Sequence, residues 1–213
     1  MSTAVAKCRA QRIFAALAKA YPDAHCELDH ATPFQLLAAT ILSAQCTDKS
    51  VNRATAGLFK DYPDAVALAK APTKKVEGHI RTLGLFRAKA RHLVGMAQGL
   101  LARHGGQVPR TRDELVQLPG VGRKTANVVL SNAFGLPGLA VDTHVLRVGK
   151  RLGLLTASDP VKAESELCAL LQPALWGAAS HLLIWHGRRI CAARRPQCQV
   201  CVLKKTCPSV GKA

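Results

Sequence analysis

Apolar residues recur along this chain with the spacing of an α-helix. Residues 4–20 show the pattern at Ile13, Phe14 and Leu17, and the segment ends before Tyr21-Pro22. The same spacing predicts further helices over 33–42, 47–60, 73–80, 86–104, 111–117, 122–134, 142–152, 160–171 and 174–190. No segment alternates convincingly with period two, so the sequence predicts an all-α fold with a cysteine-rich segment appended at its C-terminus.

Residues at the helix ends support these boundaries. Thr32 is placed to cap a helix that has Pro33 in its first turn. Gly105, Gly135 and Gly153 each follow a predicted helix, where glycine commonly terminates helical structure.

Composition excludes several classes of protein. The 213 residues are 48% hydrophobic, which is enough to bury a core, and aromatic residues make up only 4%. No apolar run approaches the ~18 residues of a membrane span, and the basic N-terminus has no apolar stretch typical of a signal peptide. We therefore expect a soluble, cytoplasmic protein.

Charge indicates the class of partner. Thirty Lys and Arg residues against thirteen Asp and Glu residues give a formal net charge of +17. No acidic residue follows Glu166, whereas seven basic residues do. This asymmetry favours a binder of nucleic acid over a basic protein whose charge serves only solubility.

Residues 118–126, with the sequence LPGVGRKTA, lie between two predicted helices. Gly120 and Gly122 allow a tight turn, and the free N–H groups at the start of the next helix can approach a phosphate. Arg123 and Lys124 add positive charge at the same place. The segment is typical of a helix-hairpin-helix that binds the DNA backbone without reading sequence.

Asp142 is most simply the N-cap of the helix that follows it. A second role is compatible with capping. The helix after Lys124 rises about 15 Å to Phe134, and the extended return to Asp142 reaches about 26 Å. An amine nucleophile with a nearby carboxylate would form a usable catalytic pair, although the spacing does not require the two residues to meet.

Four cysteines fall within seventeen residues: Cys191, Cys198, Cys201 and Cys207. Their spacing, among several basic residues, indicates a metal site in place of disulfides. Zinc and a [4Fe–4S] cluster both use four cysteinates, so the residues alone leave both open.

Six motifs in this order resemble the endonuclease III family of DNA glycosylases. They are SAQ at 43–45, GLF at 84–86, LPGVGRKTA at 118–126, VDTH at 141–144, HGR at 186–188 and the cysteine loop. The resemblance covers residues from about Phe34 to Cys207. It implies a two-lobed helix-hairpin-helix glycosylase fold, with a six-helix barrel over 24–135. A second lobe would join 1–23 to 136–213 and carry a [4Fe–4S] cluster on the four cysteines.

The resemblance also implies roles for individual residues. Lys124 would be the catalytic nucleophile and Asp142 the catalytic aspartate. Gln45 would fill the space left by a flipped nucleotide, and Leu85 would be the intercalating wedge. Further DNA contacts are expected at Leu118, Gly120, Gly122, Arg123, His144, Arg194, Arg195, Lys204 and Lys205.

The activity implied is bifunctional. A monomeric enzyme would remove oxidised pyrimidines from damaged duplex DNA through a lysine Schiff base, cut abasic sites by β-elimination, and act in the cytoplasm at the nucleoid. The alternatives are a pyrimidine-dimer or mismatch glycosylase on the same fold, or a non-catalytic iron–sulfur DNA-binding module. Cys46, directly after Gln45, departs from the smaller residue common in related sequences and leaves the pocket shape there open.

Overall fold

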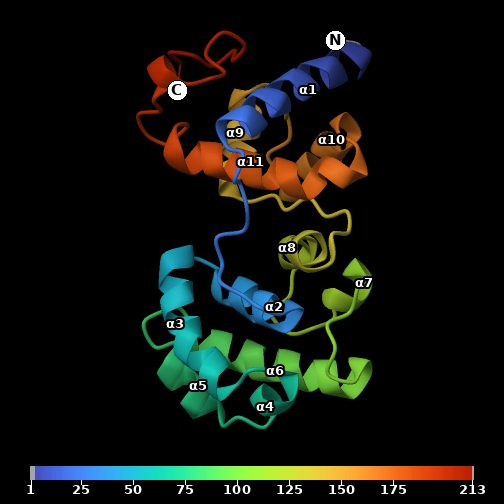
Figure 1. The fold of residues 1–213 in the computed structure, drawn as a ribbon, viewed down its shortest axis with the longest axis vertical. Helices are drawn as coiled ribbons and strands as arrows, with labels where there is room; N and C mark the ends of the chain where they lie inside the picture. The colour runs from blue at the N-terminus through green and yellow to red at the C-terminus, as the bar shows by residue number, and fades with distance from the viewer. Residues whose placement is uncertain (1–2, 213) are drawn as a thin grey trace. The chain divides into compact units, whose positions relative to one another are not determined.

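This computed structural model describes residues 3–212, and its regular elements are all helices joined by loops (Figure 1). That range contains eleven α-helices, two short 3-10 helices and no strand. The all-α prediction is therefore confirmed. Within the same range, no helix combines the length and apolar character needed to cross a lipid bilayer.

The chain divides into two compact units. The first combines Met1–Cys26 with Pro137–Ala213, and the second is the continuous segment Glu27–Leu136. The N-terminal helix thus belongs to the same unit as the C-terminal third of the chain.

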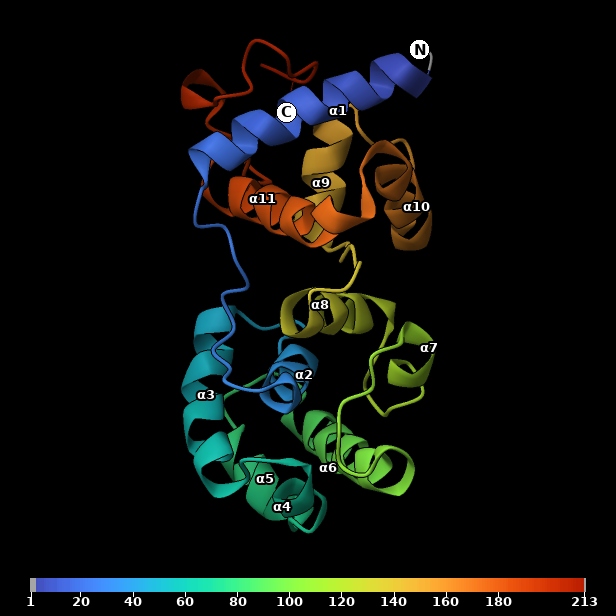
Figure 2. The ribbon, with the colours of Figure 1, turned by 45° about the vertical axis from the view of Figure 1, so that its right-hand side comes forward.

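The second unit is built around α2. Every residue of α2 from Leu36 to Leu42 is buried, and the helix packs against α3, α6 and α8 (Figure 2). A helix that is apolar on all sides is stable only when other helices enclose it. The helices of this unit are α2 (Pro33–Leu42), α3 (Asp48–Asp61), α4 (Ala65–Ala69), α5 (Thr73–His79), α6 (Phe86–His104), α7 (Arg112–Leu115) and α8 (Arg123–Phe134).

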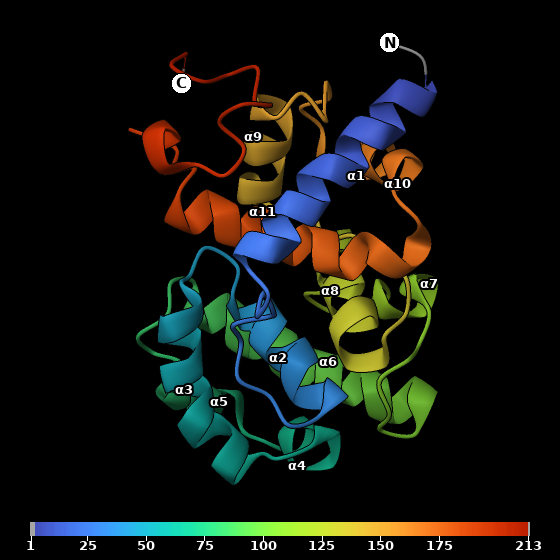
Figure 3. The same ribbon diagram turned by 45° about the horizontal axis from the view of Figure 1, so that its top comes forward.

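The first unit is built from helices at both ends of the sequence. In Figure 3, α1 lies across α11. The buried residues Ala10, Ile13 and Leu17 form a stripe along α1. Their helical spacing explains why this segment supplies one wall of the core. The helices of this unit are α1 (Thr3–Ala20), α9 (Thr143–Arg151), α10 (Pro160–Leu170), η1 (Pro173–Leu175), α11 (Trp176–Arg189) and η2 (Cys198–Val200).

Sequence reasoning missed or overextended the shortest elements. The five-residue α4 was not predicted, because so short a helix shows little periodicity, although its cap Asp64 accepts a hydrogen bond from the Ala67 amide. The helix predicted over 111–117 is one turn long, and the helix predicted over 174–190 divides into η1 and α11.

Candidate functional site

The hairpin of residues 116–122 joins α7 to α8. The buried side chains of Leu118 and Val121 anchor it, and the Val121 amide donates to the Leu118 carbonyl over 3.1 Å. Leu118 is 2% exposed, so only its main chain is placed to meet a ligand. The DNA contact that the resemblance implies at Leu118 stays a prediction, and burial of the side chain leaves the main chain to make it.

The two glycines of the hairpin have different roles. Gly120 has φ +79°, and a Cβ there would lie 2.8 Å from the His92 Cβ, so both backbone conformation and space require glycine. Gly122 has φ −96° and open space around it, so the expectation that both glycines serve the tight turn is wrong for Gly122. As the N-cap of α8 it places no capping side chain on the first amides of the helix.

Lys124 is the second residue of α8, and its side chain is exposed. The N-terminus of a helix carries free N–H groups and a partial positive charge, which together bind anions. Arg123, beside Lys124, is half-buried. The start of α8 therefore combines amides, a guanidinium group and an accessible amine at one place.

Gln45 and Leu85 share an unusual backbone conformation. Both lie in the left-handed region, with φ values of 56° and 58°. Gln45 follows α2, while Leu85 precedes α6 and is 62% exposed. Residues other than glycine adopt the left-handed region at an energetic cost, and such backbone strain concentrates at functional sites.

Asp142 caps α9, as the sequence predicts. Its Oδ1 accepts a hydrogen bond of 2.8 Å from the Val145 amide. Asp142 belongs to the first unit and Lys124 to the second, so the proposed pairing of the two side chains stays a prediction.

His144 stands in the first turn of α9. Burial lowers its pKa below the ordinary value of 6.5, the Asp142 carboxylate raises it, and the Arg147 guanidinium lowers it. Arg147 also donates to His144 Nδ1 over 3.1 Å, which suits a neutral ring. In the free protein, burial and the Arg147 guanidinium therefore both favour the neutral imidazole.

The four clustered cysteines lie in the loop around η2. Among the described residues, no group of three or more His, Cys, Asp or Glu side chains is arranged to hold a metal ion. The four thiols nevertheless influence one another. Burial raises the pKa of Cys201, and negative charge on Cys191, Cys207 and Cys198 raises it further.

Two arginines of α9 tie this loop to the helix, and sequence reasoning missed them. Arg151 donates to the Cys191 sulfur over 3.5 Å and to the Ala192 carbonyl over 2.7 Å. Arg147 donates to the carbonyls of Cys191 and Gly187. Their i, i+4 spacing, which places both side chains on one face of α9, was the available signal.

His186 connects the cysteine loop to Tyr21, which directly follows α1. Its Nε2 lies 3.6 Å from the Cys201 sulfur, and its Nδ1 lies 2.9 Å from the Tyr21 hydroxyl. Burial lowers the pKa of His186 to about 4. The adjacent Gly187 allows close helix packing, because a Cβ there would lie 3.1 Å from the His144 Cβ. These contacts explain His186 and Gly187 of the HGR motif structurally.

The four basic contacts predicted on the cysteine loop all lie at its surface. Arg194, Arg195, Lys204 and Lys205 are exposed, and Arg195 shares the left-handed conformation, with φ 53°. Exposed cations on a loop suit backbone phosphates, which need charge but little shape.

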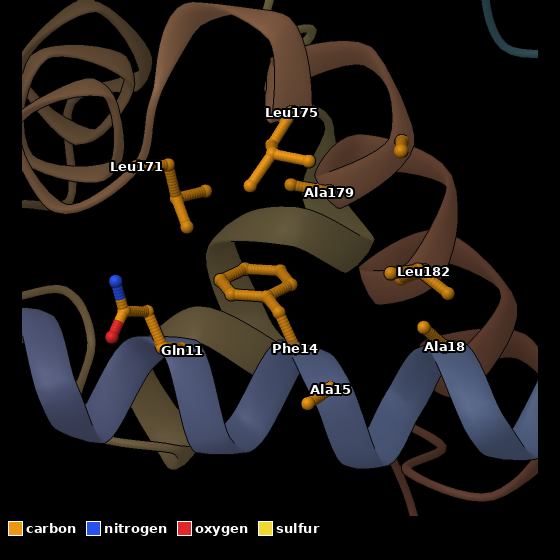
Figure 4. A pocket seen from close by; sticks show the side chains of 9 residues that line it. Gln11, Phe14, Ala15, Ala18, Leu171, Leu175, Ala179 and Leu182 are labelled. Carbon is orange, nitrogen blue, oxygen red and sulfur yellow. The ribbon is translucent and has the colours of Figure 1, made fainter.

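An apolar pocket of about 300 Å³ lies in the first unit (Figure 4). None of the predicted site residues lines it. Phe14, Leu171 and Leu182 line it, and Gln11 is its one polar side chain. The pocket therefore offers no acid, base or nucleophile for catalysis.

Comparison with known proteins identifies the family. Residues 38–173 match the HhH-GPD superfamily of base excision DNA repair proteins. Endonuclease III of Synechocystis sp. (strain ATCC 27184 / PCC 6803 / Kazusa) is 50% identical over 204 residues, covering 95% of this chain and 93% of that protein. Endonuclease III of Bacillus subtilis (strain 168) is 46% identical over 188 residues, covering 88% and 86%.

A solved structure agrees with these relatives. The trapped endonuclease III–DNA covalent intermediate, an estranged-adenine complex, has a TM-score of 0.91 and 46% identity over 95% of each chain. The chain therefore belongs to the HhH-GPD superfamily and, within it, to the endonuclease III family. It is a DNA glycosylase and AP lyase of base excision repair. The relatives favour this activity over that of a pyrimidine-dimer glycosylase, a mismatch glycosylase or a non-catalytic DNA-binding module.

Proposed function

We propose that the enzyme removes oxidised pyrimidines from duplex DNA with Lys124 as its nucleophile, and then cleaves the strand 3′ to the abasic site. The observation that carries the proposal is the position of Lys124, an exposed amine on the first turn of α8 directly after the glycine hairpin. An amine at a phosphate-binding helix end is placed to reach the sugar attached to that phosphate.

Binding begins at the DNA backbone. The first amides of α8 and the turn at Gly120 would bind a phosphate near the lesion, independently of sequence. Arg194, Arg195, Lys204 and Lys205, all exposed, would bind further phosphates. A base inside the duplex cannot be reached, so the damaged nucleotide is extruded at a cost of a few kcal/mol.

Gln45 and Leu85 would offset that cost by occupying the vacated stack. Apolar wedges inserted between bases stabilise kinked DNA. Leu85 suits this role because it is exposed and its backbone is held in a strained conformation that fixes its direction.

The chemistry follows from the amine and the carboxylate. Lys124 Nζ forms a bond to C1′ while the N-glycosidic bond breaks and its electron pair leaves with the base. Asp142 accepts the proton that the nitrogen loses and stabilises positive charge developing on the sugar. Opening of the sugar ring gives a Schiff base. Loss of a proton from C2′ then expels the 3′-phosphate, which cleaves the strand.

The cysteine loop would hold a [4Fe–4S] cluster through Cys191, Cys198, Cys201 and Cys207. Four cysteinates are the donor set that such a cluster takes. The charges of Cys191, Cys198 and Cys207 all act on Cys201, and Arg151 donates to the Cys191 sulfur. The cluster would fix the shape of the loop, and base removal and β-elimination need no electron transfer. We further propose that the enzyme acts as a monomer on damaged DNA in the cytoplasm.

Borohydride trapping tests the nucleophile. Wild type is expected to form covalent complexes both with a thymine-glycol duplex and with an abasic duplex, and Lys124→Gln with neither. Lys162→Gln is the matched control, because Lys162 is also an exposed lysine in the first turn of a helix. Equal trapping by Lys124→Gln and wild type would overturn the assignment. Trapping at the abasic site alone would refute the proposed base substrate.

The aspartate has an equally close control. Asp142→Asn should lower single-turnover base excision by about 10²–10⁴-fold, the usual range for general acid–base catalysis. Asp159→Asn removes a carboxylate from another N-cap, on α10, and should leave excision near the wild-type rate. Asparagine caps helices about as well as aspartate, so both variants should fold normally. Equal losses in the two variants would assign Asp142 to capping alone.

A further inference from the structure

Lys89, in α6, is a buried lysine in contact with a thiol. Its side chain is 4% exposed, and its ammonium donates a hydrogen bond to the Cys46 sulfur over 3.1 Å. Cys46 is half-buried, in the turn between α2 and α3, and directly follows the exposed Gln45. A buried cation therefore lies against a partly accessible sulfur.

The contact links the two strained residues of this unit. The Lys89 amide donates to the Leu85 carbonyl over 3.0 Å, and the Cys46 amide donates to the Ser43 carbonyl over 3.0 Å. The bond between Lys89 and Cys46 thus joins the turn that presents Gln45 to the first turn of the helix that Leu85 begins. A chemical change at the sulfur acts directly on this connection.

The pair also has the features of a reactive thiol. Oxidation of cysteine by a hydroperoxide needs a proton for the departing oxygen, and the Lys89 ammonium, 3.1 Å from the sulfur, is placed to give one. Partial exposure lets a small reagent reach the sulfur. Cys8, on α1, is exposed, so its reaction rate is the reference for a cysteine that is simply accessible.

We infer that Cys46 and Lys89 form an oxidation site, at which a hydroperoxide converts Cys46 to a sulfenic acid and disables the turn that carries Gln45. The sulfur attacks one peroxide oxygen, a sulfur–oxygen bond forms, and the oxygen–oxygen bond breaks. Lys89 gives a proton to the leaving oxygen, which departs as water when the oxidant is hydrogen peroxide. Sulfur is oxidised by two electrons and the peroxide is reduced by two.

The effect on repair rests on the role proposed for Gln45. An added oxygen takes the place of the sulfur as the acceptor nearest Lys89, and the turn must shift to accommodate it. Gln45 would then no longer enter the vacated stack. Thiol reductants remove the oxygen, so the loss of activity is reversible.

Labelling tests the reactive site without using activity. The cluster-loaded enzyme is treated with hydrogen peroxide and dimedone, which adds to sulfenic acids, and labelled peptides are measured by mass spectrometry. Cys46 should label on the order of tenfold faster than Cys8, and Lys89→Met should remove that advantage. Equal rates at the two cysteines in wild type would overturn the inference, whether or not the variant folds.

The effect on repair is measured as the ratio of excision after peroxide treatment to excision before it. Wild type should lose most of its excision and regain it with dithiothreitol, whereas Cys46→Ser, which keeps an acceptor for Lys89, should be resistant. The visible absorbance of the cluster shows that the loss does not come from its breakdown. Equal losses in wild type and Cys46→Ser would refute the switch. Excision by untreated enzyme tests the proposed function separately.

Discussion

At the scale of single residues, backbone strain coincides with the residues that the family resemblance selects. Among the described residues, Gln45, Leu85 and Arg195 are the non-glycine residues with positive φ. Each lies on a turn or loop, is exposed, and is assigned to DNA. A left-handed conformation costs about 1–2 kcal/mol for a residue with a Cβ. Its retention at three proposed contacts indicates that side-chain direction there matters more than stability.

Leu85→Gly separates strain from function. Glycine adopts the left-handed backbone without strain, and the exposed Leu85 side chain buries little surface. The free energy of unfolding of the variant should therefore be about 1 kcal/mol higher than that of wild type. Excision of thymine glycol should nevertheless fall, because the wedge is lost. Chemical denaturation and single-turnover kinetics measure the two effects.

Leu175→Gly is the control for that prediction. Leu175 is 49% exposed but has an ordinary φ of −96°, so glycine there should destabilise the fold and leave excision unchanged. Should Leu85→Gly be less stable than wild type, the strain assigned to Leu85 would be wrong.

At the scale of elements, α9 connects several parts of the first unit. Asp142 caps its start, and Arg147 and Arg151 tie it to the cysteine loop. Arg9, from α1, donates to the carbonyls of Leu152 and Gly153 at its end, where a cation also complements the helix dipole. One nine-residue helix therefore positions both the proposed catalytic aspartate and the proposed cluster ligands.

The loop after α9 depends on a carboxylate of α10. Glu166 accepts hydrogen bonds from the Thr156 hydroxyl and amide over 2.5 and 2.7 Å, and from the Ala157 amide over 3.3 Å. The Thr156 hydroxyl is the main cause that lowers the pKa of Glu166 below its ordinary value of 4.5. The stabilisation is therefore present above that value and is lost as the pH falls through the lowered pKa.

Glu166→Gln should lower the free energy of unfolding at pH 7 by about 1 kcal/mol, because a charged acceptor is replaced by a neutral one. The difference from wild type should shrink as the pH falls from 4.5 through the lowered pKa, because Glu166 of wild type is then protonated as well. Urea denaturation at several pH values measures this. A difference that stays constant with pH would show that the charge of Glu166 does not contribute to the free energy of unfolding.

Sequence reasoning succeeded where a signal is local. The caps Thr32 and Asp142 both accept the hydrogen bonds expected of them, because capping depends on residues three positions apart. It failed for contacts between distant segments. Cys46 and Lys89 are separated by 43 residues, and no local pattern indicates that they meet. The strain at Gln45 and Leu85 is likewise a product of packing, since neither residue type favours it.

At the scale of the whole molecule, charge sets how the enzyme approaches DNA. The net charge of +17 attracts any polyanion, whereas the hairpin and the cysteine loop offer specific places for phosphates. Long-range attraction and local contact make different predictions. The first depends on total charge, and the second depends on where the charges lie.

The two contributions can be separated by the salt dependence of binding. The logarithm of the association constant should fall linearly with the logarithm of salt concentration, with a slope of about −0.9 per phosphate contacted. Replacing Arg194, Arg195, Lys204 and Lys205 together with glutamine should reduce that slope by about 3 to 4. Fluorescence anisotropy with an abasic-analogue duplex measures it.

The control for this last prediction removes the same four charges elsewhere. Lys60, Lys70, Lys74 and Lys75 are exposed residues on or beside α3, α4 and α5, outside every proposed contact. Their replacement with glutamine should slow association modestly at low salt and leave the slope nearly unchanged, because no counterion is released where no phosphate is bound. Equal slopes in the two variants would mean that total charge governs binding and that the cysteine loop makes no phosphate contacts.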